Sequence, residues 1–240
     1  QWNNVPSSPI STSLTYGFYA GKNVGLGLSI VTDKVFIEQS TFVGIDYSYK
    51  IQLDETASLY LGLKAGANLY SLNTFNLNTY NPYYVDPSLN SVDDLMPNLG
   101  IGAYLQKRSF YISVGIPRLL STERARAANG RVTSVRDIPH IYSSIGYNFL
   151  VNKLQNIRIK PSIFTRNVIG APMSLDVNTM VSFLDRFELG ATYRSGGNYA
   201  GIVQLGVTES LKIAWTYEVN RQLELSSVGD SLEFLLLYEF

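Results

Sequence analysis

The chain has 240 residues, 45% of them hydrophobic and only 16% charged, and its 19 basic residues balance 19 acidic ones. Soluble domains average roughly 25% charged residues, so this chain has few groups with which to cover a wet surface. Zero net charge excludes a nucleic-acid partner held by phosphate neutralisation, the absence of Cys excludes disulfide scaffolds and thiolate metal sites, and the high hydrophobicity excludes intrinsic disorder.

Hydrophobic residues alternate with small or polar residues along almost the whole chain. In 57–69, every odd-numbered residue is Ala or Leu, whereas the even-numbered ones are Ser, Tyr, Gly, Lys and Asn. Strict alternation places the apolar side chains on one face of a β-strand. The pattern predicts an all-β chain of about thirteen strands, at 9–20, 23–32, 39–51, 57–70, 97–107, 109–116, 138–150, 156–166, 174–184, 187–194, 199–207, 211–219 and 230–240.

The connections between these strands alternate in length. The second, fourth and later even-numbered connections are all short, whereas the longest, 71–96 and 117–137, are the fifth and seventh. In an up-and-down antiparallel arrangement, alternate connections lie at the same end, so one end carries long loops and the other carries tight turns. Outer-membrane barrels have this asymmetry. We therefore predict a single domain over 1–240, a transmembrane antiparallel up-and-down β-barrel.

The strand count and the length of the apolar runs agree with this fold. The longest apolar run, Phe234–Tyr238, has five residues, far short of the roughly 18 that a membrane-spanning helix needs. Single-chain bacterial barrels have an even number of strands. We therefore expect about fourteen, the additional one lying before Gln1-Trp2, which would be the tip of a strand already under way.

The two faces of the strands have opposite character. A barrel of this width cannot fill its lumen with side chains, so the apolar face must meet lipid and the polar face must line the lumen. Aromatic residues on the outward face near strand ends are typical of interfacial girdles. The inward charges have mixed signs, which favours pairing across the lumen over ion selection, although solvated charges in a wet lumen remain an alternative. The candidate network is Asp46, Lys64, Arg158, Lys160, Asp176, Glu188, Arg194 and Glu233.

The two long loops contain the candidate contact residues. Loop 117–137 has a net charge of +3 and could contact lipopolysaccharide phosphates or an acidic protein. Loop 71–96 is rich in Tyr and Asn, which suits protein contact. Alternatively, the two loops simply neutralise each other. The candidates are Tyr80, Tyr83 and Tyr84 in the first loop, and Arg118, Arg124, Arg126 and Arg131 in the second.

Little in the sequence points to catalysis. Gly25-Leu26-Gly27 lacks the third glycine and the following helix of a nucleotide-binding loop. His140 is the single histidine, which excludes a multi-histidine metal site. Because Asp137, Ser143 and Ser144 lie nearby, an outer-membrane lipase or protease remains an alternative, but a structural role for His140 is favoured. We predict no enzymatic activity and no cofactor or metal.

The last strand ends on alternating apolar residues up to Phe240, which resembles the C-terminal signature recognised during insertion of bacterial outer-membrane proteins. Five stretches, which together span essentially the whole chain, resemble the PorP/SprF family of Bacteroidetes outer-membrane proteins, associated with type IX secretion and gliding. They are Gln1-Trp2 with its Pro/Ser-rich tail, 25–29 with Asp33-Lys34, 111–120, 159–162 running to 170–178, and 188–194 with the closing strands.

The resemblance implies a fourteen-stranded barrel, including the strand before Gln1, and a function that is not catalytic. Such proteins act as partners of secreted adhesins or other type IX cargo, hold the cargo's C-terminal domain at the cell surface, and link to periplasmic ring or peptidoglycan-associated components. Asp176, Arg194 and the long loops would then contact the cargo or plug the mouth. One departure is visible: the family's last strand usually opens Gly-Ser-His-Glu, whereas 229–233 reads Gly-Asp-Ser-Leu-Glu. The alternative function is a transport channel for a small or hydrophobic solute.

Overall fold

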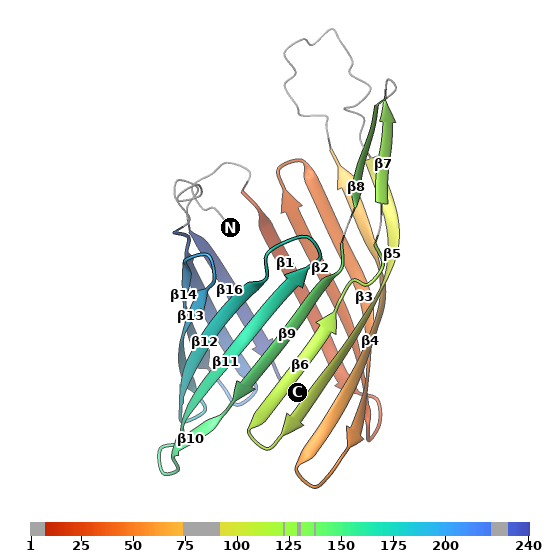
Figure 1. The fold of residues 1–240 in the computed structure, drawn as a ribbon. Coiled ribbons are helices and arrows are strands. Elements are labelled where there is room, and N and C mark those ends of the chain that lie inside the picture. The colour runs from red at the N-terminus through yellow and green to blue at the C-terminus, as the bar shows by residue number, and fades with distance from the viewer. Residues whose placement is uncertain (1–7, 74–91, 122, 129–130, 137, 222–229) are drawn as a thin grey trace.

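The computed structural model describes residues 8–73, 92–121, 123–128, 131–136, 138–221 and 230–240. These residues form a strongly curved antiparallel sheet with steeply tilted strands (Figure 1). The strands are β1 (Ile10–Tyr19), β2 (Val24–Val35), β3 (Glu38–Gln52), β4 (Ala57–Leu72), β5 (Val92–Lys107), β6 (Phe110–Ile116), β7 (Glu123–Ala128), β8 (Arg131–Arg136), β9 (His140–Tyr147), β10 (Phe149–Asn152), β11 (Ile157–Val168), β12 (Ser174–Phe183), β13 (Phe187–Arg194), β14 (Asn198–Gly206), β15 (Leu211–Val219) and β16 (Ser231–Tyr238).

The sheet has up-and-down topology. Fourteen of the strands form it, in the order β1-β2-β3-β4-β5-β6-β9-β11-β12-β13-β14-β15-β16, with β10 continuing β9 beyond Asn148 and pairing with β11. Each pair is antiparallel, and the register is continuous from β1 to β5 and from β11 to β16. The predicted all-β antiparallel fold is confirmed. No helix in the described residues is long and apolar enough to cross a membrane.

The prediction that 117–137 is a plain loop was wrong. The segment contains β7 and β8, which pair only with each other and rise above the rim of the sheet (Figure 1). In the sequence, Asn129-Gly130 separates two short alternating segments, which is a strong signal for a two-residue hairpin. The alternation is easily overlooked because Arg and Ala, rather than β-branched residues, occupy most of β7.

The predicted loop 71–96 was too long, because β4 extends to Leu72 and β5 begins at Val92, opposite it. The strand predicted from the sequence begins at Pro97, because proline is tolerated at the first residue of a strand. β6 ends opposite Ile101, so the first half of β5 has a regular ladder only with β4. A strand tolerates proline, which cannot donate to a ladder, at a position where the ladder on one side has ended.

The end of the barrel opposite β7 and β8 has tight turns, which we call the short-turn end. In the turn between Phe183 and Phe187, Leu184 and Asp185 both have φ of 54°, a left-handed conformation, and the Arg186 N–H donates to the Phe183 carbonyl at 3.0 Å. In another of these turns, Asp54 accepts hydrogen bonds from the backbone N–H (2.7 Å) and the hydroxyl (2.9 Å) of Thr56. These bonds favour the carboxylate and lower the pKa of Asp54.

The sheet is not closed, because β1 and β16 are not hydrogen-bonded to each other within the described residues. Because β1 and β16 are the first and the thirteenth strands of an up-and-down sheet, they run in the same direction, toward the short-turn end. There the ring centroids of Tyr16 and Phe240 are 5.8 Å apart. A strand lying between them would have to run the opposite way to be antiparallel to both. The strand expected before Gln1 lies outside the described residues and stays a prediction.

The distribution of polarity is the reverse of that in a water-soluble protein. On the outer face, the side chains of Ile45 and Leu63 are 64% and 59% exposed. On the inner face, Asn68, Asn98 and Asp176 are buried. Apolar side chains outside and polar side chains inside are the arrangement of a barrel surrounded by lipid.

Candidate functional site

Arg194 is the centre of the largest group of paired charges on the inner wall. Its Nε and Nη2 donate to the carboxylate of Asp176 at 3.0–3.1 Å, and its Nη1 donates to Glu218 at 2.9 Å. The amide of Asn198 also donates to Glu218, at 2.9 Å. The strand register explains the group, because Asp176, Arg194 and Asn198 are direct cross-strand partners and therefore share the inner face.

Further ion pairs line the same face. Lys64 contacts Asp46 at 2.7 Å, and Lys160 contacts Glu188 at 2.7 Å. Seven of the eight charges predicted as a lumen network are in ion pairs, the weakest being Arg158 with Asp185 at 3.7 Å, while Glu233 forms none within the described part of the chain. The partners lie on strands one or two places apart along the wall or, for Asp185, in the turn between β12 and β13. The described pairs are therefore lateral, whereas we expected pairs across the lumen.

At the end where β7 and β8 rise, which we call the loop end, the inner wall encloses a cavity of about 490 Å³. We call it the mouth cavity. Its lining combines apolar side chains with five charged or titratable ones. These residues come from β2 to β5, the segment after β6, and the beginning of β9 with the two residues before it. The residues are Val31, Asp33, Phe42, Lys64, Asn68, Met96, Asn98, Pro117, Arg118, Leu120, Ile138, Pro139, His140 and Tyr142.

The floor of the mouth cavity is the ring of Phe42, which is only 4% exposed. The ring lies over Gly44 and Gly66, which are cross-strand partners: a Cβ at Gly66 would meet Phe42 Cζ at 2.7 Å and the Val43 carbonyl at 2.3 Å. Arg118 lies over the same ring, with its Cζ 5.4 Å from the centroid. Two glycines therefore make room for an aromatic side chain, which in turn supports a cation in the cavity.

Asn98 holds the segment that carries Arg118. Its Nδ2 donates to the Leu120 carbonyl at 3.0 Å, and its Oδ1 accepts from the Leu120 N–H at 3.1 Å. One residue earlier, the Leu119 N–H donates to the Leu99 carbonyl at 2.7 Å. The chain after β6 thus stays alongside β5 instead of leaving the wall, and Arg118 is directed over Phe42.

We expect Asn98→Ala to loosen this segment, because both hydrogen bonds to Leu120 are lost. Each such bond contributes on the order of 1 kcal/mol, so amide hydrogen exchange at Leu119 and Leu120 should speed up by about tenfold. The matched control is Asn178→Ala on β12, whose side chain accepts from Thr192 far along the wall. Unchanged exchange at Leu120 in Asn98→Ala would show that the backbone alone holds the segment.

An outer wall that is apolar, an inner wall of paired charges and a single up-and-down sheet together describe a membrane barrel, and the family comparison agrees. The family model for "Type IX secretion system membrane protein PorP/SprF" matches residues 1–238. This chain belongs to the PorP/SprF family. A comparison with curated proteins found no match. Family membership and the all-β fold place the protein in the bacterial outer membrane as a component of the type IX secretion system.

The structure separates the loop candidates of this PorP/SprF protein. Arg118 lies in the mouth cavity. Arg124, Arg126 and Arg131 belong to the hairpin of β7 and β8, and only their backbone is described. Tyr80, Tyr83 and Tyr84 lie outside the described residues. Asn68 and Asn98 are not among the residues predicted from the sequence, because inward polar residues are common in these strands and no local pattern distinguishes the two.

The structure does not assemble the residues of the hydrolase alternative. His140 Nδ1 bonds the Ile138 carbonyl at 3.0 Å, and its ring stacks on Tyr142. Ser144 faces the lumen and shares a 2.8 Å hydrogen bond with Ser113. Ser143 has the opposite parity, and Asp137 lies outside the described residues. His140 makes no hydrogen bond to either serine in the described structure, and PorP/SprF is a family of secretion-system membrane components.

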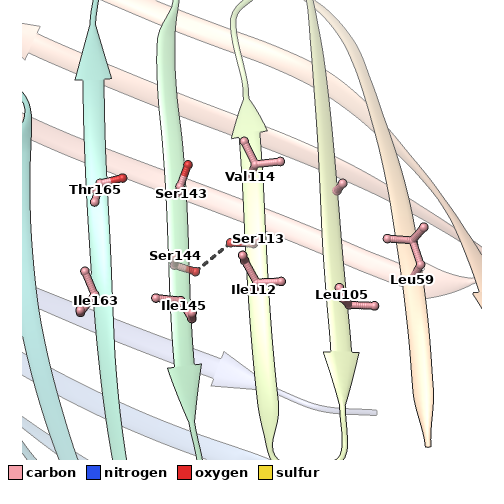
Figure 2. Close-up of a pocket in the computed structure, with 11 residues that line it drawn as sticks. Leu59, Leu105, Ile112, Ser113, Val114, Ser143, Ser144, Ile145, Ile163 and Thr165 are labelled. Atoms are coloured by element: carbon pink, nitrogen blue, oxygen red, sulfur yellow. Dashed lines mark hydrogen bonds between the residues drawn. The ribbon is translucent and has the colours of Figure 1, made fainter.

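Figure 2 shows a second depression, a groove of about 340 Å³ across β4, β5, β6, β9 and β11. Ile112, Val114, Ile145 and Ile163 surround it, and Ser143 lies among them. These residues have the outward parity, so the groove belongs to the lipid-facing surface. It offers neither a charge nor, among the described residues of the chain, a cluster of His, Cys, Asp or Glu able to hold a metal.

Proposed function

We propose that this PorP/SprF protein binds a secreted type IX cargo protein at the loop end of its barrel and retains it at the cell surface, without catalysis. One observation carries the proposal. The ion-pairing capacity of Arg194, Lys160 and Lys64 is satisfied by neighbours on the wall, whereas Arg118 in the mouth cavity has no carboxylate partner in the described structure. Arg118 therefore offers a cation at the loop end to a carboxylate of the cargo.

The orientation of the barrel supports this assignment. In outer-membrane barrels, short turns face the periplasm and longer connections face the exterior. The chain ends at the short-turn end, where the Glu239 N–H donates to the Ser210 carbonyl at 2.8 Å (Figure 1). The mouth cavity and the hairpin of β7 and β8 lie at the opposite end, which faces outward. Links to periplasmic ring or peptidoglycan-associated components belong to the same proposal and would use the short-turn end.

The proposal is tested by purifying the protein in mild detergent and identifying the proteins that accompany it. A large secreted protein with a type IX C-terminal domain is the expected companion. The competing function, a channel for a small or hydrophobic solute, predicts steady conductance in planar bilayers instead. The mixed and laterally paired charges give such a channel no bias toward cations or anions. Conductance without a co-purifying secreted protein would favour the channel.

Reversing the charge of Arg124, Arg126 and Arg131 together to Glu is expected to release cargo from the surface. The three positions lie on the hairpin that projects beyond the rim, and a change of six charge units there would repel an acidic partner. The measurement is the ratio of surface-bound to released cargo, which we expect to fall by about tenfold. The triple Arg→Lys variant is the matched control and should keep most of the cargo, and equal retention in both variants would contradict a role for the hairpin charge.

A further inference from the structure

Two side chains in the mouth cavity can donate hydrogen bonds to a ligand. The guanidinium of Arg118 is half-buried and touches the face of Phe42, with no carboxylate paired to it across the described ranges. Asn68 is only 6% exposed, and its Oδ1 accepts from the Ser40 hydroxyl at 2.8 Å. Because the Oδ1 of Asn68 already accepts a hydrogen bond, the Nδ2 of the same amide is the group that can donate to a ligand. A half-buried guanidinium without a carboxylate gains a charge-assisted hydrogen bond when a ligand supplies one.

The other charges in the cavity do not serve the same purpose. Lys64 is already bonded to Asp46 at 2.7 Å and to the Ser29 hydroxyl. Asp33 accepts a 2.7 Å hydrogen bond from Ser11 and keeps acceptor capacity for an N–H donor. The available chemistry is therefore one cation for an anion, one amide donor for a carbonyl, and one carboxylate for an N–H.

A peptide backbone combines these groups, and the cavity already binds one. Asn98 receives the N–H and donates to the carbonyl of Leu120, which is how an asparagine side chain holds an extended chain. Asn68 lies on the neighbouring strand, on the same face and one inward position closer to the loop end, because Asn68 pairs with Met96 and Asn98 pairs with Gly66. The remaining lining near Phe42 and Met96 is apolar, and a volume of about 490 Å³ lies within the range of ligand pockets.

We propose that the mouth cavity binds an extended acidic peptide segment. Its carboxylate pairs with Arg118, its backbone bonds the amide of Asn68, and an apolar side chain next to the acidic residue lies against Phe42 and Met96. The inference rests on the proposed function, because it names the part of a cargo chain that this site would receive. The carboxylate can belong to an Asp or Glu side chain or to a chain terminus, and both sources present the same chemistry to Arg118.

The test measures binding of fluorescent synthetic pentapeptides to the full chain in detergent by fluorescence anisotropy. One probe, Tyr-Val-Asp-Val-Leu with an amidated end, carries only the side-chain carboxylate. A second has Asn in place of Asp, and a third has Asn and a free C-terminus. We expect one or both carboxylate peptides to bind at least about tenfold more tightly than the amidated Asn peptide, and the tighter of the two identifies the source.

Substitutions then assign the preference to the cavity. Arg118→Gln should remove the difference between carboxylate and amide peptides, and Arg118→Lys should retain part of it. The matched control is Arg221→Gln, because Arg221 also lies over an aromatic ring, with its Cζ 5.7 Å from the centroid of Tyr199, but outside the cavity. If Arg118→Gln fails to fold, Asn68→Leu serves instead, and it should weaken all peptides while keeping the order of the three.

Three results would overturn the inference: equal binding of all three peptides, an unchanged preference in a folded Arg118→Gln variant, or displacement of the peptide by octanoate at an equal concentration, which would indicate a fatty-acid site. Co-purification from cells separates this failure from failure of the proposed function. If Arg118→Gln loses the carboxylate preference but keeps its secreted companion, the cavity binds acidic peptides while the cargo is held elsewhere, and the assignment of the peptide to the cargo is wrong. If the wild-type protein has no secreted companion, the proposed function itself fails.

Discussion

Replacing Gly66 by alanine is expected to destabilise the barrel by about 1–3 kcal/mol, the usual cost of overpacking. The added methyl group would lie 2.3 Å from the Val43 carbonyl and 2.7 Å from both the Gly44 Cα and the Phe42 ring. Two of these neighbours are backbone atoms of the adjacent strand and cannot rotate away, so the two strands must separate. The measurement is the urea midpoint of the barrel folded into lipid vesicles.

The control for this prediction is Gly201→Ala. Gly201 is also a strand glycine, but a Cβ there would meet nothing within 4 Å. Alanine suits a strand better than glycine, so the midpoint should stay the same or rise slightly. Because Gly66→Ala also displaces the ring under Arg118, it should weaken binding of acidic peptides as well. An unchanged midpoint in Gly66→Ala would mean that the strands separate at negligible cost.

Replacing Arg194 by methionine is expected to cost about 1–3 kcal/mol in the same measurement. Removing one partner of a buried ion pair usually costs roughly 3–5 kcal/mol, but the side chain of Arg194 is 37% exposed, so solvent screening reduces the figure. The change leaves Asp176, whose side chain is only 12% exposed, without a counter-charge, and removes one donor from Glu218. The barrel loses stability because the folded state of the variant contains an unpaired carboxylate on the inner wall.

A double-mutant cycle separates pairing from packing. Adding Asp176→Asn to Arg194→Met removes the unpaired carboxylate and should restore part of the lost stability. The matched single control is Lys153→Met in an exposed turn at the other end of the barrel, expected within about 0.5 kcal/mol of wild type. If Arg194→Met is no less stable than Lys153→Met, the ion pair contributes nothing to the stability of the barrel. The inward charges are then solvated by water in the lumen, which is the alternative to ion pairing.

Much of the fold could be predicted because the period of two is a local property. The 57–69 alternation fixes which side chains of β4 face the lumen, and the same holds for most strands. The misses have local causes as well. The alternation does not predict the hairpin of β7 and β8 because Arg and Ala occupy most of β7, and it predicts too short a β5 because Pro97 suggests a break.

The candidate site was less predictable. Charge alone grouped Arg118 with Arg124, Arg126 and Arg131, yet the structure places Arg118 inside the cavity and the other three on a hairpin beyond the rim. Arg118 is held apart from the other three arginines by the hydrogen bonds between the Asn98 side chain and the backbone of Leu120, which is 22 residues away in the sequence. In the sequence, Asn98 and Asn68 are two inward polar residues among many, and no local pattern distinguishes them.

The alternation of apolar and polar residues is enough to assign each side chain to one face, because successive residues of a strand point to opposite faces whatever their neighbours are. It therefore predicts a barrel with an apolar outer face and charges on the inner face. Which residues meet on that inner face depends on long-range contacts. Lys160 and Glu188 are 28 residues apart and two strands apart along the wall, so their contact depends on the register of two ladders and on the curvature of the sheet. The lateral pairing of charges, and the position of Arg118 in the mouth cavity without a carboxylate partner among the described residues, follow from that geometry.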